Sequence, residues 1–442
     1  MLGQFKPVET NYDLDRRCME GTRQSILNEL MDWVTNPQKE YNGPQKNTYW
    51  FCGVPGIGKT SLAHSICETP HDRKHLAGAF FCQGDDRDLS KLRNVLLTLI
   101  NKLFPPFRTI VADCLRNDPN LTSNSMKYSL FLDFIRNLPR HPEHALVFVI
   151  DALDECGDDQ SRPALLRVLA DAAAQASWLK IIITSRPEDD IQYFFKALTQ
   201  SSYSSYDLST DPEANADLRT FAQSQFSLIA KKWCLATPWP EGSLFDGVIS
   251  RANGLFIFIK TVVLSLHHCE DPTESLKAAL RDSAGTGLKS LYKLYSSILK
   301  SRVVHNSAEF QQVIGVLLTT SPYRPLCEET IAELAGLKPN LVKKWVNDLS
   351  SLLYRDDAVN RGIRVRHLSI SEFFFTDQCA YQVNPQDTNV HLGISCLKTM
   401  IGQLRFNICE LNDSRLANAS VNDLPSRVKE NLSESLRYSV LY

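Results

Sequence analysis

The chain of 442 residues is long enough for about three domains, and its contents of 43% hydrophobic and 22% charged residues are ordinary for a globular protein. A net charge of -2 gives no support to a polyanionic partner, so no nucleic acid is expected to bind. The 12 cysteines include no CxxC pair, which argues against zinc and haem sites and favours scattered thiols in a reducing compartment. No apolar run reaches the ~18 residues of a membrane span, and no signal peptide is recognisable. We therefore expect a cytoplasmic protein with no membrane partner.

The predicted elements begin with one helix in an N-terminal segment, residues 1–45. Apolar residues recur every three or four positions in the stretch RQSILNELMDWV, and this spacing predicts an amphipathic helix. The expected apolar face carries Ile26, Leu27, Leu30, Met31 and Val34.

Residues 46–210 alternate strand patterns with helix patterns. The expected strands are TYWFC at 48–52, GAFFC at 78–82, ALVFVI at 145–150, LKIIIT at 179–184 and, as an edge strand, YDLS at 206–209. Two of these runs, ALVFVI and LKIIIT, are continuously apolar, which is typical of strands buried on both faces of a parallel sheet. A long amphipathic helix is predicted over 88–104, with Leu89, Leu92, Leu96, Leu99 and Leu103 at helical spacing. This alternation predicts an α/β fold with an open sheet.

The pattern changes to helix after helix beyond residue 211. We expect a helical domain over 211–285 and a further domain over 286–378. In the latter, helices precede two short strand-like pieces, LLYRDD and IRVRHLS, which is the outline of a winged helix. Residues 379–442 are again helical in pattern.

A complete GxxxxGK[ST] motif follows the strand at 48–52 and precedes a predicted helix. Its glycines allow the backbone N–H groups to point at phosphate oxygens, and the helix N-terminus adds partial positive charge. Lys59 is expected to reach the β- and γ-phosphates, and Thr60 is expected to offer its hydroxyl to Mg²⁺. The residues predicted to bind the nucleotide here are Gly53, Val54, Pro55, Gly56, Ile57, Gly58, Lys59, Thr60 and Ser61.

Three carboxylates stand at the end of the apolar run LVFVIDALDEC, residues 146–156. Asp151 ends the strand and is expected to hold Mg²⁺ through water. Many ATP hydrolases have a glutamate at the next position, which is Ala152 here, while Asp154 and Glu155 follow slightly later. Either acid could orient the attacking water, with a mainly structural role as the alternative. We expect slow, regulated hydrolysis.

A positive charge follows the strand at 179–184. Arg186 lies at the carboxyl end of this strand, the edge where ligands of open α/β sheets bind. It is expected to sense the γ-phosphate and to stabilise charge during its transfer. The alternative is a surface ion pair with Glu188 or Asp189.

Together these residues resemble the NACHT family of P-loop NTPases, within the STAND class, and most closely its fungal members linked to heterokaryon incompatibility. The similarity covers roughly residues 15 to 440. Its carriers, in chain order, are CMEGTRQSIL, GVPGIGKTS, FVIDALDEC, IIITSRPE, RANGLFIFI and VRHLSISEFF.

The resemblance implies a P-loop NTPase sheet of strand order 5-1-4-3-2, then a helical domain and a winged-helix domain that close over ADP and open with ATP. It implies that Gly21, Thr22 and Arg23 lie near the base and sugar. His367 is expected to contact the β-phosphate, with a satisfied core histidine as the alternative. Phe256 stands where many relatives have a proline, so this segment is not expected to contact the base.

The resulting hypothesis is a slowly hydrolysing signalling switch that uses ATP or ADP with Mg²⁺, GTP being left open. By resemblance it acts in fungal-type innate immunity or incompatibility cell death and self-associates when NTP-bound. No separate effector domain or C-terminal repeat sensor is recognisable in this sequence. The chain is therefore expected to be a truncated product, a fragment, or a switch module that works with separate effector or sensor chains. The alternatives are a DNA-associated ATPase that uses the winged helix and a scaffold that binds nucleotide without hydrolysing it. Lys343 and Lys344 sit among Asp348, Asp356 and Asp357, so the winged helix has no basic stripe for DNA.

Overall fold

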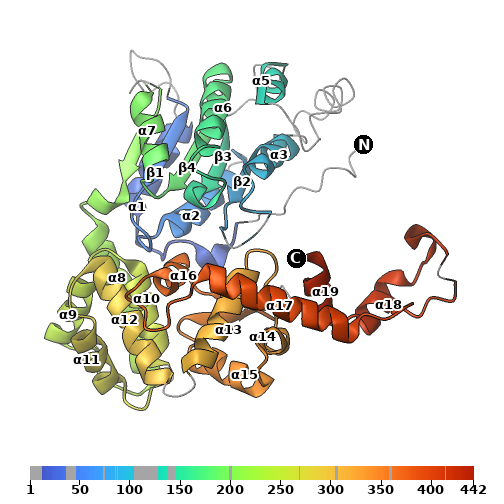
Figure 1. The fold of residues 1–442 in the computed structure, drawn as a ribbon. Helices are drawn as coiled ribbons and strands as arrows, with labels where there is room; N and C mark the ends of the chain where they lie inside the picture. Colours follow the sequence, from blue (N-terminus) through green and yellow to red (C-terminus); the bar gives the residue numbers. More distant parts are fainter. Residues whose placement is uncertain are drawn as a thin grey trace. The chain divides into compact units, whose positions relative to one another are not determined.

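The computed structural model divides the chain into two compact units, Met1–Ile259 and Lys260–Tyr442. The boundary falls inside one helix, α10 (Phe256–Leu266). Figure 1 shows the fold of the two units. The structure describes residues 12–35, 46–72, 75–84, 86, 88–103, 128–137, 145–198, 202–267, 269–303, 307–357, 361–413 and 415–442.

The first unit contains a five-stranded parallel sheet in the order β2-β3-β4-β1-β5. Its strands are β1 (Thr48–Cys52), β2 (Leu76–Phe81), β3 (Leu146–Asp151), β4 (Leu179–Ser185) and β5 (Ser204–Asp207). This is the predicted order 5-1-4-3-2 read from the other edge, so that prediction is confirmed. The strands β3 and β4 are buried along almost their whole length, as their continuous apolar runs predict.

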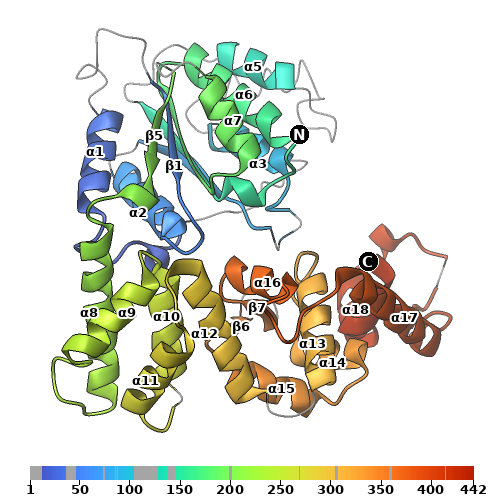
Figure 2. The same cartoon turned by 60° about the vertical axis from the view of Figure 1, so that its left-hand side comes forward.

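Helices cover both faces of this sheet. In chain order, the helices of the first unit are η2 (Leu14–Arg16), α1 (Gln24–Thr35), α2 (Lys59–Asp72), α3 (Leu92–Leu103), α5 (Tyr128–Asn137), η4 (Leu153–Glu155), α6 (Arg162–Gln175), α7 (Asp189–Ala197), η5 (Leu208–Thr210), α8 (Ala214–Lys232) and α9 (Gly242–Ala252), followed by the start of α10. Figure 2 shows α1 and α2 on one side of the strands and α3, α6 and α7 on the other.

The two faces carry separate hydrophobic cores because successive strand residues point in opposite directions. On β1, Tyr49 and Phe51 pack with α1 and α2, whereas Trp50 and Cys52 pack with the helices of the opposite face. The N-terminal helix contributes Ile26, Leu30, Trp33 and Val34 to the first core. Leu27 and Met31 are only half-buried, and Trp33 takes a place that the predicted face lacks.

The helix predicted over 88–104 begins later, at Leu92. The cause is a local turn, in which the Asp86 carboxylate accepts hydrogen bonds from the backbone N–H groups of Asp88 and Leu89. Short polar side chains that bond nearby backbone groups compete with helix formation in this way. Leu89 therefore packs from a turn rather than from the helix.

The second unit is mainly helical. Its elements after α10 are α11 (Pro272–Asp282), α12 (Gly287–Arg302), α13 (Ser307–Thr320), α14 (Glu328–Ala335), α15 (Pro339–Asp348), β6 (Leu353–Asp356), β7 (Gly362–Val365), α16 (Leu368–Phe375), α17 (Pro385–Gln403), η7 (Asn418–Ser420), α18 (Leu424–Asn431) and α19 (Glu434–Leu441). The strands β6 and β7 form an antiparallel pair after the helices. The winged-helix assignment and the boundaries at 211, 286 and 379 stay predictions. Within the described ranges, no helix is both long enough and apolar enough to cross a membrane.

Candidate nucleotide-binding site

The phosphate-binding motif forms the loop between β1 and α2, and two of its glycines have backbone conformations that other residues rarely adopt. Gly56 has a φ of +79° and Gly58 a φ of +99°. A Cβ atom added to Gly56 would lie 2.2 Å from Cγ2 of Ile257, so a side chain does not fit there. The loop is therefore built as the motif predicts, with its glycines required by geometry.

The helix α2 begins directly after this loop, with Lys59 and Thr60 as its first two residues. The Lys59 ammonium, buried to 9% exposure, donates hydrogen bonds to the carbonyl oxygens of Gly53 (2.8 Å) and Val54 (3.1 Å). Burial lowers the pKa of Lys59, and the positive charge of Arg186 lowers it further. The carboxylates of Asp154, Asp151 and Glu155 oppose this shift in the Lys59 pKa. The predicted charged residues thus form one electrostatic cluster around the loop lysine.

Asp151 lies at the end of β3 with 2% exposure. Its Oδ1 accepts a hydrogen bond of 2.5 Å from the Thr184 hydroxyl. Burial raises the pKa of Asp151, while hydrogen bonds from Thr184 and Thr60 lower it. A hydroxyl and a carboxylate side by side at the loop are oxygen ligands suited to Mg²⁺. Thr184 was not predicted as a site residue, although a hydroxyl near the end of an apolar strand could have indicated it.

The chain turns sharply after Asp151. Ala152 has a φ of +53°, which is strained for a residue with a side chain. The Glu155 N–H then donates to the Ala152 carbonyl oxygen (2.9 Å), closing the single turn η4. This turn brings Asp154 and Glu155 back to the end of the strand. Strain of this kind clusters at functional sites.

Asp154 is engaged by two arginines. Its carboxylate accepts a hydrogen bond from the Arg186 backbone N–H (2.8 Å), and its Oδ2 lies 3.2 Å from Arg186 Nε. Its carbonyl oxygen accepts a hydrogen bond from Arg162 (2.9 Å), which also pairs with Asp190 (2.7 Å). The predicted catalytic residues Asp154 and Arg186 therefore contact each other. An ion pair joins Arg186 to Asp154. The alternative pairing of Arg186 with Glu188 or Asp189 stays a prediction.

Glu155 has a different environment. It is half-buried, and its Oε2 accepts a hydrogen bond from the backbone N–H of Gly84 (3.1 Å), in the loop after β2. Burial raises the pKa of Glu155 to about 8. A carboxylate with a pKa near neutrality is suited to general-base chemistry. Sequence reasoning missed Gly84, because nothing in its neighbourhood indicates a contact with residue 155.

The residues around the loop fit a magnesium nucleoside triphosphate. The glycine conformations open a cradle of N–H groups, a lysine lies beside it, and Thr60 contacts Asp151. Within the described part of the chain, no group of three or more His, Cys, Asp or Glu residues could hold a metal ion. A site of one carboxylate and one hydroxyl suits Mg²⁺, which keeps several waters and binds phosphate oxygens. When bound, Mg²⁺ neutralises charge on the transferred phosphoryl group.

The segment predicted to lie near the base and sugar packs against the phosphate loop. Gly21 has a φ of +83°, and the buried Thr22 hydroxyl donates to the Met19 carbonyl oxygen (2.7 Å). The Arg23 guanidinium is 3% exposed, pairs with Asp211 and donates to the Ile57 carbonyl oxygen (3.2 Å). Contacts of these residues with the base stay predictions, and Asp211 was not predicted at all.

His367 caps a helix in the second unit. Its Nδ1 accepts a hydrogen bond from the backbone N–H of Ser369 (3.1 Å) at the start of α16. The Ser369 hydroxyl in turn lies 2.9 Å from the Tyr295 hydroxyl. The predicted contact of His367 with the β-phosphate stays a prediction.

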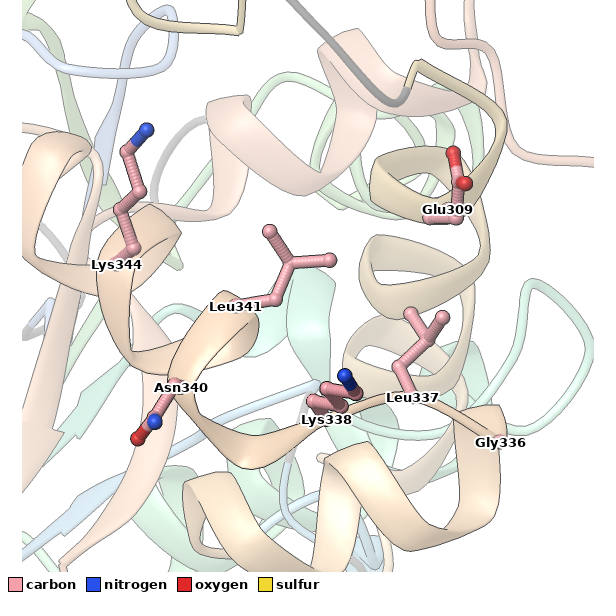
Figure 3. A pocket seen from close by; sticks show the side chains of 7 residues that line it. All are labelled: Glu309, Gly336, Leu337, Lys338, Asn340, Leu341 and Lys344. Carbon is pink, nitrogen blue, oxygen red and sulfur yellow. The ribbon is translucent and has the colours of Figure 1, made fainter.

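A separate hollow of about 730 Å³ lies between α13 and the start of α15. Leu337, Leu341, Lys338 and Lys344 contribute to its lining (Figure 3). None of the predicted nucleotide-binding residues lines it.

Comparisons with known proteins agree with this geometry. Residues 21–186 match the family model described as nephrocystin 3, N-terminal. The chain is 25% identical over 337 residues to the vegetative incompatibility protein HET-E-1 of Podospora anserina. This match covers 73% of the present chain but only 24% of that relative.

Among solved structures, the Walker-type ATPase PABY2304 of Pyrococcus abyssi aligns with 82% of this chain and 99% of its own, at 12% identity and a TM-score of 0.39. Cdc6p from Pyrobaculum aerophilum aligns with 92% of this chain and 99% of its own, at 13% identity and a TM-score of 0.36. The family match and the incompatibility relative agree with the motifs of the sequence, and together they support a NACHT-type P-loop NTPase.

Proposed function

We propose that the chain is a nucleotide-dependent signalling switch that binds ATP or ADP with Mg²⁺ and hydrolyses ATP slowly. The observation that carries the proposal is the division of labour between the two acids after β3. Asp154 forms an ion pair with Arg186. Glu155 instead has a pKa of about 8 and accepts a hydrogen bond from Gly84 in the loop after β2. One carboxylate positions a cation, and the other is suited to accept a proton.

The chemical step follows from these positions. Glu155 takes a proton from water as the water oxygen bonds to the γ-phosphorus. The bond from the γ-phosphorus to the β–γ bridging oxygen breaks, and ADP and inorganic phosphate are the products. Lys59 and Arg186 offset the negative charge of the phosphoryl group during the transfer. With a pKa of about 8, Glu155 is ionised in only about one molecule in ten at pH 7, which supports slow turnover.

Self-association or a protein partner is supported by an apolar face on α17. Val390, Ile394, Leu397 and Ile401 are 64%, 49%, 60% and 83% exposed. They follow one another at helical spacing, so they share one face of the helix. Contiguous exposed apolar residues of this kind mark interaction surfaces. A role in incompatibility signalling rests on the likeness to HET-E-1, which concerns about a quarter of that protein.

The first test is to purify the protein, denature it and identify the nucleotide that is released. Near-stoichiometric ADP, followed by exchange for ATP, is the expected result for a resting switch. An empty site with fast steady-state ATP turnover would instead identify an ordinary ATPase. Lys59→Ala is the matched control, because it removes the loop cation and should weaken nucleotide binding in either case. Salt-dependent retention on DNA would favour the DNA-associated alternative.

A further inference from the structure

Arg23 lies in a buried cluster of charged residues behind the phosphate loop. It is 3% exposed and adopts a φ of +56°. Its guanidinium pairs with Asp211, its Nε lies 3.8 Å from Asp217 Oδ2, and its backbone N–H donates to the same oxygen (3.0 Å). The guanidinium carbon also lies 5.6 Å from the centre of the Phe256 ring. One side chain thus joins the segment before α1 to the start of α8 and the start of α10.

The charges of this cluster do not indicate that its role is to stabilise the fold. Two buried carboxyl groups, those of Asp211 and Asp217, surround one guanidinium, so the cluster has more acidic than basic side chains away from water. Burial raises the pKa of Asp217, which shows that its ionised form is costly there, and the contacts with Arg23 oppose this shift. Buried ion pairs often contribute little net stability compared with apolar packing. The cluster is therefore better explained if Arg23 orients a neighbouring part of the chain.

The group that Arg23 orients is the phosphate loop itself. Its Nη2 donates a hydrogen bond to the Ile57 carbonyl oxygen (3.2 Å), and the Ile257 N–H donates to the Gly56 carbonyl oxygen (3.3 Å). Two successive loop carbonyls are therefore held from outside the loop. In a planar trans peptide the C=O and N–H groups point in opposite directions. Holding these carbonyls consequently turns the N–H groups of Ile57 and Gly58 the other way, as a phosphate-binding nest requires.

We infer that Arg23, clamped by Asp211 and Asp217, is a positioning residue that preorganises the phosphate loop without touching the nucleotide. Phe256, at the start of α10, packs on this guanidinium and approaches Gly58, where an added Cβ would lie 3.8 Å from its ring. The inference rests on the proposed nucleotide binding. It assigns Arg23 to the phosphate end of the ligand rather than to the base or sugar.

The test is the substitution Arg23→Lys, measured by competition of ADP and of AMP against a fluorescent ATP analogue. Lysine keeps the charge and faces the same backbone strain, but a single ammonium cannot reproduce the fork that spans Asp211 and the loop carbonyl. ADP affinity is expected to fall about tenfold to a hundredfold, the effect of losing one charged hydrogen bond. AMP affinity should change less than about twofold, because AMP lacks the β-phosphate that the nest holds in ADP.

The control is Arg219→Lys on α8. The side chain of Arg219 is 43% exposed, pairs with Asp246 and stacks on Phe245. This substitution should leave both affinities unchanged. Equal losses for ADP and AMP in Arg23→Lys would place Arg23 at the base or sugar and overturn the inference. Unchanged ADP affinity in a folded variant would also overturn it, while leaving nucleotide binding intact. Failure of the unmodified protein to bind ADP would refute the proposed function instead.

A milder variant covers the case in which Arg23→Lys does not fold. Asp217→Asn keeps the shape of the clamp and removes one of its charges. It should lower ADP affinity by a smaller factor than Arg23→Lys does, and it should leave AMP affinity unchanged. An Asp217→Asn protein that binds ADP as tightly as the unmodified chain would contradict the role of the clamp.

Discussion

The raised pKa of Glu155 leads to a quantitative prediction about catalysis. Burial raises this pKa from its usual 4.5 to about 8 in the protein without nucleotide. A general base acts only when ionised, and kcat/KM reports the ionisation of the free enzyme. The ionised fraction rises from about one in ten at pH 7 to one half at pH 8, so kcat/KM should increase about fivefold over that interval and level off above pH ~9. Glu155→Gln should lose both the pH dependence and about 10²- to 10⁴-fold in rate.

The assay is phosphate release at saturating Mg²⁺ between about pH 6 and about pH 9.5, an interval that contains the midpoint. Asp154→Asn is a useful companion, because the negative charge of Asp154 contributes to the raised pKa of Glu155. Its profile should keep the rise with pH but move the midpoint lower. A rise that persists unchanged in Glu155→Gln would assign the titration to Lys59 or Asp151 and refute the role given to Glu155.

Three further predictions concern stability, the loop and the surface. Because the pKa of Glu155 is higher in the folded than in the unfolded protein, its contribution to stability is full below pH ~4.5 and is lost as the pH rises through about 8. Glu155→Gln should therefore flatten the pH dependence of the unfolding free energy, by at most a few kcal/mol, in urea titrations. Gly56→Ala should cost about 1–3 kcal/mol and weaken ADP binding, since its Cβ would meet Ile257 at 2.2 Å; unaltered calorimetric binding would contradict this. Ile394→Asp should reduce ATP-dependent self-association in sedimentation experiments, whereas Asn389→Asp on the same helix should not.

The sheet and the phosphate loop were predictable because their signals are local. A run of apolar residues with no alternation identifies a doubly buried strand, and β3 and β4 begin within one residue of the predicted positions. The predicted start of α3 was wrong because the Asp86 carboxylate accepts hydrogen bonds from two backbone N–H groups. The spacing of apolar residues does not reveal such bonds. The identity of Asp151 as a strand-end acid beside Thr60 also followed from the motifs.

The partners of the charged residues were not predictable in the same way. Arg186 was expected to sense the γ-phosphate, with a surface ion pair to a near neighbour as the alternative, and it forms an ion pair with Asp154, 32 positions away. Arg23 pairs with Asp211, which is 188 positions away. Neither pair has a spacing that a sequence pattern could show, because each forms only when the strands and helices have packed.

The amino-acid sequence by itself determined which residues supply the chemistry: a glycine loop with a lysine, a strand-end aspartate and two nearby acids. These follow from steric and electrostatic requirements that act over a few consecutive residues. Only the tertiary structure decided how the charges are shared. It engages Asp154 with Arg186, raises the pKa of Glu155 through burial, and clamps Arg23 behind the loop. The physical reason is that desolvation and ion pairing depend on which distant segments exclude water from a side chain, and packing alone sets that.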